Sequence, residues 1–93
     1  MPEQAIKRRM SRAKQKAEKD LQRLGFKTVP SNNKPVCLVA INRDGVQVDV
    51  RIIRICLDEI KPIDKKSLSG YDGLHRELWI RKEGSENFEI HKV

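Results

Sequence analysis

The sequence predicts an α/β (α+β) fold in which a long N-terminal helix packs on a mixed central sheet, within a single domain spanning residues 1–93. Apolar residues recur at helical spacing through residues 3–24, which predicts one amphipathic helix. Several apolar segments of strand length follow, and turn residues separate them. A chain of 93 residues has room for one hydrophobic core and not for two.

The helix predicted for residues 3–24 has a narrow apolar stripe rich in small residues, so it can lie close against a sheet. Pro2 fits a helix start, and Gly25 fits the left-handed residue that often follows a helix end. The members of the stripe are Ile6, Met10, Ala13, Ala17, Leu21 and Leu24.

Residues 26–57 are expected to form the core of the sheet. A short strand at 26–30 precedes a continuously apolar segment at 36–41, which predicts a strand covered on both faces. The Asp-Gly turn at 42–45 joins it to a second arm at 46–57, as in a hairpin. On that arm Asp49 and Arg51 point to one face, because strand side chains alternate.

Residues 58–77 form a variable link in which Pro62 can open a short helix, and residues 78–93 read as a C-terminal hairpin. Cys37 and Cys56 lie in apolar runs without metal-site spacing, and we expect buried free thiols. The basic N-terminus lacks the apolar region of a signal peptide, and no segment approaches membrane-spanning length. We therefore expect a cytoplasmic protein with no membrane partner.

The charge is strongly positive and unevenly spread. The formal net charge is +7, and within residues 7–19 seven cations face the single acid Glu18. Such a block favours a polyanionic partner, most often nucleic acid, although it is also compatible with a solvated helix face. The cations are Lys7, Arg8, Arg9, Arg12, Lys14, Lys16 and Lys19.

Three motifs together resemble the restriction-endonuclease-like, PD-(D/E)xK nuclease superfamily, and within it the small Holliday-junction-resolvase-like and endonuclease-like proteins. They are "AEKDLQRLGF" at 17–26, "VCLVAINRDG" at 36–45 and "VDVR" at 48–51. The resemblance covers about residues 10–57 and implies a nuclease-like core of helix, strand, hairpin and acid-x-base strand.

The resemblance also implies the site residues. Glu18 matches the helix glutamate, Asp49 the second carboxylate and Arg51 the basic residue, so an active enzyme would hold Mg²⁺ with Asp49 and Glu18. Arg51 would stabilise the negative charge that develops on the phosphate. Cys37 stands where the family has its first carboxylate, and a thiol is a poor Mg²⁺ ligand. Asp44 and Glu59 are the available substitutes.

The expected function is therefore nucleic-acid binding by an endonuclease-like protein, with DNA favoured over RNA as the partner. It is either a metal-dependent phosphodiesterase or a catalytically degenerate relative, and the resemblance also implies a homodimer. The alternative is a non-enzymatic nucleic-acid-binding or protein-interaction module, in which Asp49 and Arg51 form only an exposed ion pair. His75 and His91 have no evident orienting acid and are not expected to act as acid, base or metal ligand.

Overall fold

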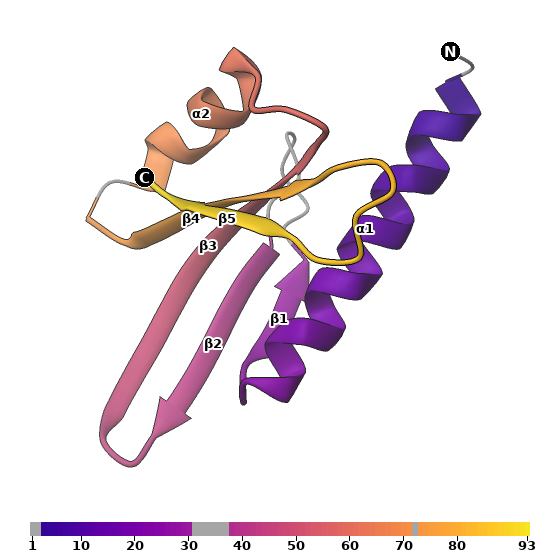
Figure 1. The fold of residues 1–93 in the computed structure, drawn as a ribbon. Coiled ribbons are helices and arrows are strands. Elements are labelled where there is room, and N and C mark those ends of the chain that lie inside the picture. The colour runs from indigo at the N-terminus through magenta and orange to yellow at the C-terminus, as the bar shows by residue number, and fades with distance from the viewer. Residues whose placement is uncertain (1–2, 31–37, 72) are drawn as a thin grey trace.

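The computed structural model describes residues 3–30, 38–71 and 73–93 and shows an α+β fold (Figure 1). A five-stranded sheet is accompanied by one long and one short helix. The elements in chain order are α1 (Glu3–Arg23), β1 (Lys27–Pro30), β2 (Leu38–Asp44), β3 (Gln47–Leu57), α2 (Pro62–Leu68), the 3-10 turn η1 (Ser69–Tyr71), β4 (His75–Arg81) and β5 (Glu89–Lys92).

The strands lie in the sheet in the same order as in the chain. Neighbouring strands are antiparallel except for β3 and β4, which are parallel and are connected through α2. Such a connection is required because two parallel strands cannot be joined by a tight turn. The long hairpin of β2 and β3 extends beyond the other strands, as Figure 1 shows.

The helix α1 covers one face of the sheet. Ala13, Ala17 and Leu21 are buried at its centre, because they lie four residues apart and so share one side of the helix. Gly25 ends the helix at φ 90°, and the Phe26 amide donates to the Leu21 carbonyl at 2.9 Å. This is the glycine-dependent helix end that the sequence indicates. The sheet residues of this core are Phe26, Leu38, Ala40, Ile53, Ile55 and Trp79.

The opposite face of the sheet is covered only in part, by α2. Leu68 packs there in a second core with Ile52, Cys56, Leu78 and Ile80, which alternate along β3 and β4 with the residues that face α1. The start of α2 is held by Asp64, whose carboxylate accepts the Lys61 amide at 2.9 Å and the Arg54 Nε at 2.8 Å. Asp64 therefore caps the helix and ties it to β3.

Most of the predicted elements are confirmed. The N-terminal helix, the Asp-Gly hairpin, the short helix at Pro62 and the C-terminal hairpin all form, and Cys56 is a buried free thiol. The strand β4 begins at His75, inside the segment predicted as a link. Cys37 lies outside the described residues. Within those residues, no helix is long and apolar enough to cross a membrane.

One prediction about the sheet is wrong. The apolar segment at 36–41 was expected to be covered on both faces, and its residues 36 and 37 lie outside the described part of the chain. Leu38 and Ala40 face α1 and are buried, whereas Val39 and Ile41, on the other face, are only partly buried. The reason is that α2 is short and packs on β3 and β4.

Candidate functional site

Four exposed cations form one continuous side of α1, which we call the outer face. Each residue of an α-helix is turned by about 100° from the one before it. Arg8, Arg12, Lys19 and Arg23 therefore lie within a sector of about 60°, on the side opposite the buried Ala17. The sector extends over about 22 Å between its first and last cation. Glu18 and Asp20, the acids of α1 whose side chains are described, lie outside it.

The other predicted cations of α1 are placed differently. Arg9 is half-buried and binds Asp58, while Lys16 forms an ion pair of 3.4 Å with Asp20 one turn further on. Lys7 and Lys14 lie on the flank of the helix that also carries Glu18. The seven cations predicted from the sequence therefore divide between the outer face, the flanks and internal ion pairs.

Asp49 and Arg51 share one face of β3, as their spacing predicts. Arg51 donates to Asp49 Oδ2 from Nε at 3.3 Å and from Nη2 at 3.2 Å. The guanidinium also lies over the Phe26 ring, 4.9 Å from its centroid. Arg51 is thus held between an aromatic face and a carboxylate, which fixes its position beside the core under α1.

Next to Arg51 lies a buried carboxylate, that of Glu77, which the sequence analysis did not identify. Glu77 is only 3% exposed, and its Oε1 accepts the Trp79 indole N–H at 3.1 Å. Its Oε2 lies 3.0 Å from His75 Nε2 and 3.7 Å from Arg51 Nη1. These partners satisfy a buried charge that would otherwise be strongly unfavourable. Asp49, Arg51, His75 and Glu77 together form what we call the sheet cluster.

Glu18 does not join the sheet cluster. Arg9 and Asp20 point in nearly the same direction around α1, and Arg9 reaches Asp58 at the end of β3. That flank of the helix therefore faces β3 and β4. Glu18 is two residues before Asp20, so the two side chains point about 160° apart around the helix. Among the described contacts, none joins Glu18 to Asp49 or Arg51.

The sheet register also separates Asp49 from the start of β2. The nucleases that the sequence resembles have their first carboxylate next to this point. Leu38, the first residue of β2, pairs with Ile53. Asp49 pairs with Asn42 near the hairpin turn, and it lies about 13 Å along the strand from Ile53. The position of Cys37 itself lies outside the described residues.

The carboxylates predicted to bind Mg²⁺ are not arranged as a Mg²⁺ site. Mg²⁺ requires several oxygen ligands in near-octahedral geometry, usually with one or two carboxylates. The Oδ2 atom of Asp49 is occupied by Arg51, and Glu18 points elsewhere. Asp44 and Glu59 are both exposed, at the β2–β3 turn and after the end of β3. In the described part of the chain, no three or more His, Cys, Asp or Glu side chains are grouped so as to hold a metal ion.

A third group of polar contacts, centred on Asp58, joins α1 to the end of β3 and to the β4–β5 turn. Asp58 accepts Arg9 Nη1 at 2.9 Å and Nη2 at 2.8 Å, and it also accepts the Glu83 amide at 3.1 Å. The hydrogen bond from Arg9, followed by that from the Glu83 amide, lowers the pKa of Asp58 to about 2. The same contact raises the pKa of Arg9. Asp58 therefore stays ionised and connects α1, β3 and the β4–β5 turn.

Some of these residues have a signal in the sequence and others do not. The spacings His75-x-Glu77 and Glu89-x-His91 put each histidine beside an acid on a strand, at 3.0 and 2.9 Å, so the expectation that neither has an orienting acid is wrong. Arg23 could have been added to the outer face from its spacing alone. The Arg9–Asp58 pair spans 49 residues and has no such signal.

The chain was compared with protein-family models, with curated proteins and with solved structures. None of the three comparisons found a match. The class defined by the fold and the site is accordingly an α+β domain with a cationic helix on one face of a mixed sheet.

Proposed function

We propose that this protein binds nucleic acid, with DNA favoured over RNA, through the outer face of α1, and that it does not hydrolyse its ligand. The observation that carries the proposal is the outer face itself. Arg8, Arg12, Lys19 and Arg23 are all exposed, and the described acids of the helix lie outside the sector that these four residues occupy. Duplex DNA carries one phosphate charge per about 1.7 Å of its axis, so a face about 22 Å long can contact several phosphates at once.

We further propose that the protein is a catalytically degenerate relative of the restriction-endonuclease-like nucleases. It is supported by the order of α1, β2, hairpin and β3, and by the placement of Asp49 and Arg51 on one face of β3. The proposed absence of hydrolysis is supported by the positions of the two carboxylates that were predicted to bind Mg²⁺. Arg51 occupies Asp49, and Glu18 lies on the flank of α1 that faces away from β3 and β4. Homodimer formation stays a prediction.

The binding proposal is tested by removing charge from the outer face without touching the core. We would measure fluorescence anisotropy of a labelled duplex with the wild type and with Arg8→Gln/Lys19→Gln. The matched control is Lys65→Gln/Lys66→Gln, which removes two exposed cations from α2, on the opposite face of the sheet. At about 0.1 M salt the outer-face variant should bind about tenfold more weakly or worse, because two phosphate contacts are lost.

The control variant should bind within about twofold of the wild type, because its charges lie far from the outer face and are screened by salt. If both double variants bind the duplex as the wild type does, the proposal fails, and a protein-interaction module becomes the better interpretation.

The second half of the proposal is tested with plasmid and branched DNA in Mg²⁺ or Mn²⁺. We expect no cleavage above the background seen with Asp49→Ala. Metal-dependent cleavage that is lost in Asp49→Ala would contradict the proposal and restore the hydrolytic interpretation.

A further inference from the structure

The hairpin of β2 and β3 carries an apolar surface on the side of the sheet that faces away from α1. Because side chains alternate along a strand, Val39 and Ile41 of β2 point away from the buried residues that contact the helix. Val50 of β3 pairs with Ile41 and therefore shares that side. We call this surface the open face. Its apolar members are Val29, Val39, Ile41, Val48 and Val50.

Within the described residues, the open face is covered only at one end. The helix α2 lies toward the end of β3 that is remote from the hairpin turn (Figure 1), and Val39 borders the core beneath it. Val29 and Val48 are 50% and 53% exposed. On the α1 side, the same hairpin carries polar residues such as Asn42 and Asp49. A sheet face that stays in water normally carries polar side chains, so a contiguous apolar face marks an interaction surface.

Two cations lie at one edge of the open face. Lys27 of β1 pairs with Ile41, and Arg43 follows Ile41 by two residues on β2, so the three side chains point the same way. Both cations are exposed, and neither forms an ion pair within the described part of the chain. The acids of this hairpin, Asp44 and Asp49, fall on the α1 side by the same alternation. The open face therefore combines apolar side chains with uncompensated positive charge.

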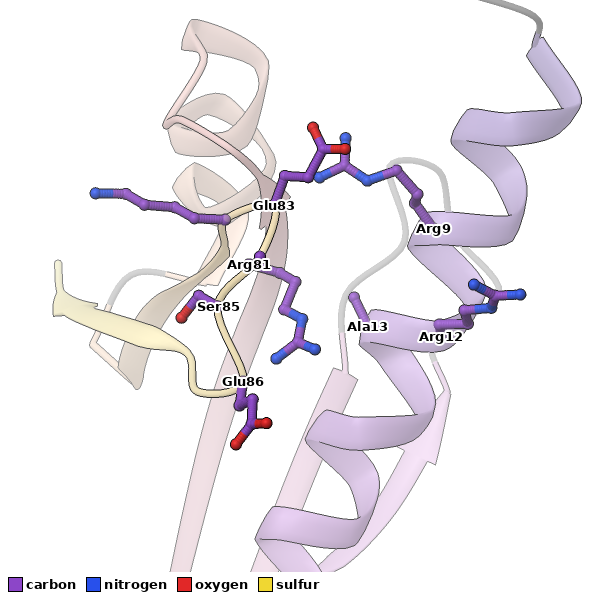
Figure 2. Close-up of a pocket in the computed structure, with 9 residues that line it drawn as sticks. Arg9, Arg12, Ala13, Arg81, Glu83, Ser85 and Glu86 are labelled. Carbon is purple, nitrogen blue, oxygen red and sulfur yellow. The ribbon is translucent and has the colours of Figure 1, made fainter.

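The cavity at this edge differs in charge from the one between α1 and the β4–β5 turn. The latter has a volume of about 410 Å³, and Glu83 and Glu86 line it together with arginines (Figure 2). The cavity at the open face has a volume of about 370 Å³. Its described lining includes Lys27, Ile41 and Arg43 and contains no acid. An acidic group from outside the chain would supply the missing counter-charge.

We propose that the open face binds an amphipathic helix of a partner protein, whose apolar stripe covers Ile41, Val48 and Val50. An acidic side chain of that helix lies in the cavity and accepts hydrogen bonds from Lys27 and Arg43. The apolar face of a sheet is normally buried by a packed element, as α1 buries the opposite face. The open face is about 14 Å long, so a helix of about ten residues can cover it. Nucleic-acid binding by α1 is not required, because the open face lies on the other side of the sheet.

A second copy of the chain is a poor occupant of the open face. In a two-fold interface the same surface meets itself, so Lys27 and Arg43 of both copies would be brought together without an acid between them. The net charge of +7 on each copy adds to the repulsion. The apolar members of the face are all aliphatic, without the Trp and Tyr side chains that anchor proteins at a membrane surface. An acidic helix satisfies both the charge and the apolar area.

The probe for the test is a fluorescein-labelled peptide of about 14 residues, with leucines three and four residues apart, glutamates beside them and alanines elsewhere. Fluorescence anisotropy measures its binding to the full chain. Val48→Ser, at a half-exposed position, should weaken binding about tenfold, because it removes an apolar contact. The matched control is Val46→Ser in the hairpin turn, where the side chain is fully exposed, and it should bind within about twofold of the wild type.

The charge of the partner is tested by exchange. Lys27→Glu/Arg43→Glu should lose the glutamate peptide and bind a version in which lysine replaces glutamate. Arg8→Gln/Lys19→Gln should keep the glutamate peptide within about twofold, because the outer face of α1 is not used. The inference is overturned if the wild type does not bind the glutamate peptide, or if Arg8→Gln/Lys19→Gln loses it while the open-face variants keep it. Sedimentation of the free protein as a dimer that Val48→Ser dissociates would assign the open face to a second copy and overturn it too.

Discussion

Arg9 and Asp58 are 49 residues apart in the chain, yet the two guanidinium nitrogens Nη1 and Nη2 of Arg9 lie 2.9 and 2.8 Å from the two carboxylate oxygens of Asp58. Asp58 has φ 67°, a left-handed conformation that aspartate tolerates better than most residues. The pair fixes the first half of α1 against the end of β3, and Asp58 also holds the β4–β5 turn through the Glu83 amide.

The Arg9–Asp58 pair should give the fold a defined dependence on pH. Because the folded pKa of Asp58 is about 2 and its ordinary value is 3.8, ionised Asp58 stabilises the fold above about pH 4. That contribution is lost as the pH falls toward 2. Thermal unfolding followed by circular dichroism should show a lower Tm for Asp58→Asn than for the wild type at pH 7, with the difference shrinking between pH 4 and pH 2. A difference that stays constant down to pH 2 would contradict the role of this carboxylate.

The packing of α1 on the sheet depends on Leu21. Leu21 is 0% exposed, whereas Leu24, three residues later, is 64% exposed and serves as the matched control. Leu21→Ala should lower the free energy of unfolding by about 2–5 kcal/mol, because it leaves a cavity in the core. Leu24→Ala should change it by about 0.5 kcal/mol or less. Urea unfolding measures both, and equal losses in the two variants would mean that α1 does not pack as described.

The ion pair of Arg54 and Asp64 should matter more than an ordinary surface pair. Both side chains are largely buried, and Asp64 also accepts the Lys61 amide at the start of α2. Asp64→Ala should cost about 3 kcal/mol of unfolding free energy, because it leaves a buried guanidinium without this carboxylate and the helix without its cap. Asp20→Ala, which breaks the partly exposed pair with Lys16 on α1, should cost about 0.5 kcal/mol. Urea unfolding that gives similar losses for both would contradict this assignment.

The sheet cluster should divide into a structural and a dispensable half. Glu77 is buried and accepts the Trp79 indole N–H, so Glu77→Ala should destabilise the fold by about 3 kcal/mol. Asp49 is exposed and its carboxylate forms an ion pair with Arg51, so Asp49→Ala should cost less than about 1 kcal/mol. Denaturant unfolding of the two variants, with Trp79 as the fluorescent probe, is the measurement. A larger loss for Asp49→Ala than for Glu77→Ala would reverse the assignment.

Much of the fold could be predicted because its signals are local. The stripe through Ala13, Ala17 and Leu21 and the cap at Gly25 lie within one helix, and the Asp-Gly turn specifies its hairpin. The parallel pairing of β3 with β4 could not be read in this way. It joins Arg51 to His75 across α2, and alternation within a strand says nothing about which strand lies beside it.

The candidate site shows the same division. The shared face of Asp49 and Arg51 follows from a spacing of two on a strand, and the outer face of α1 follows from helical spacing. Asp58 was missed because its partner Arg9 comes from another element. Glu77 was missed although His75 and Trp79 lie two residues from it on the same strand. Arg51 reaches Glu77 only through the parallel pairing of β3 with β4.

The most direct test of nucleic-acid binding by the outer face of α1 is the salt dependence of duplex binding. The logarithm of the association constant should fall linearly with the logarithm of the salt concentration, with a slope of about −0.9 for each phosphate contacted. Arg8→Gln/Lys19→Gln should make that slope shallower by about 1.8, and Lys65→Gln/Lys66→Gln should leave it unchanged. The same slope for the wild type and both double variants would contradict the outer face as the binding surface.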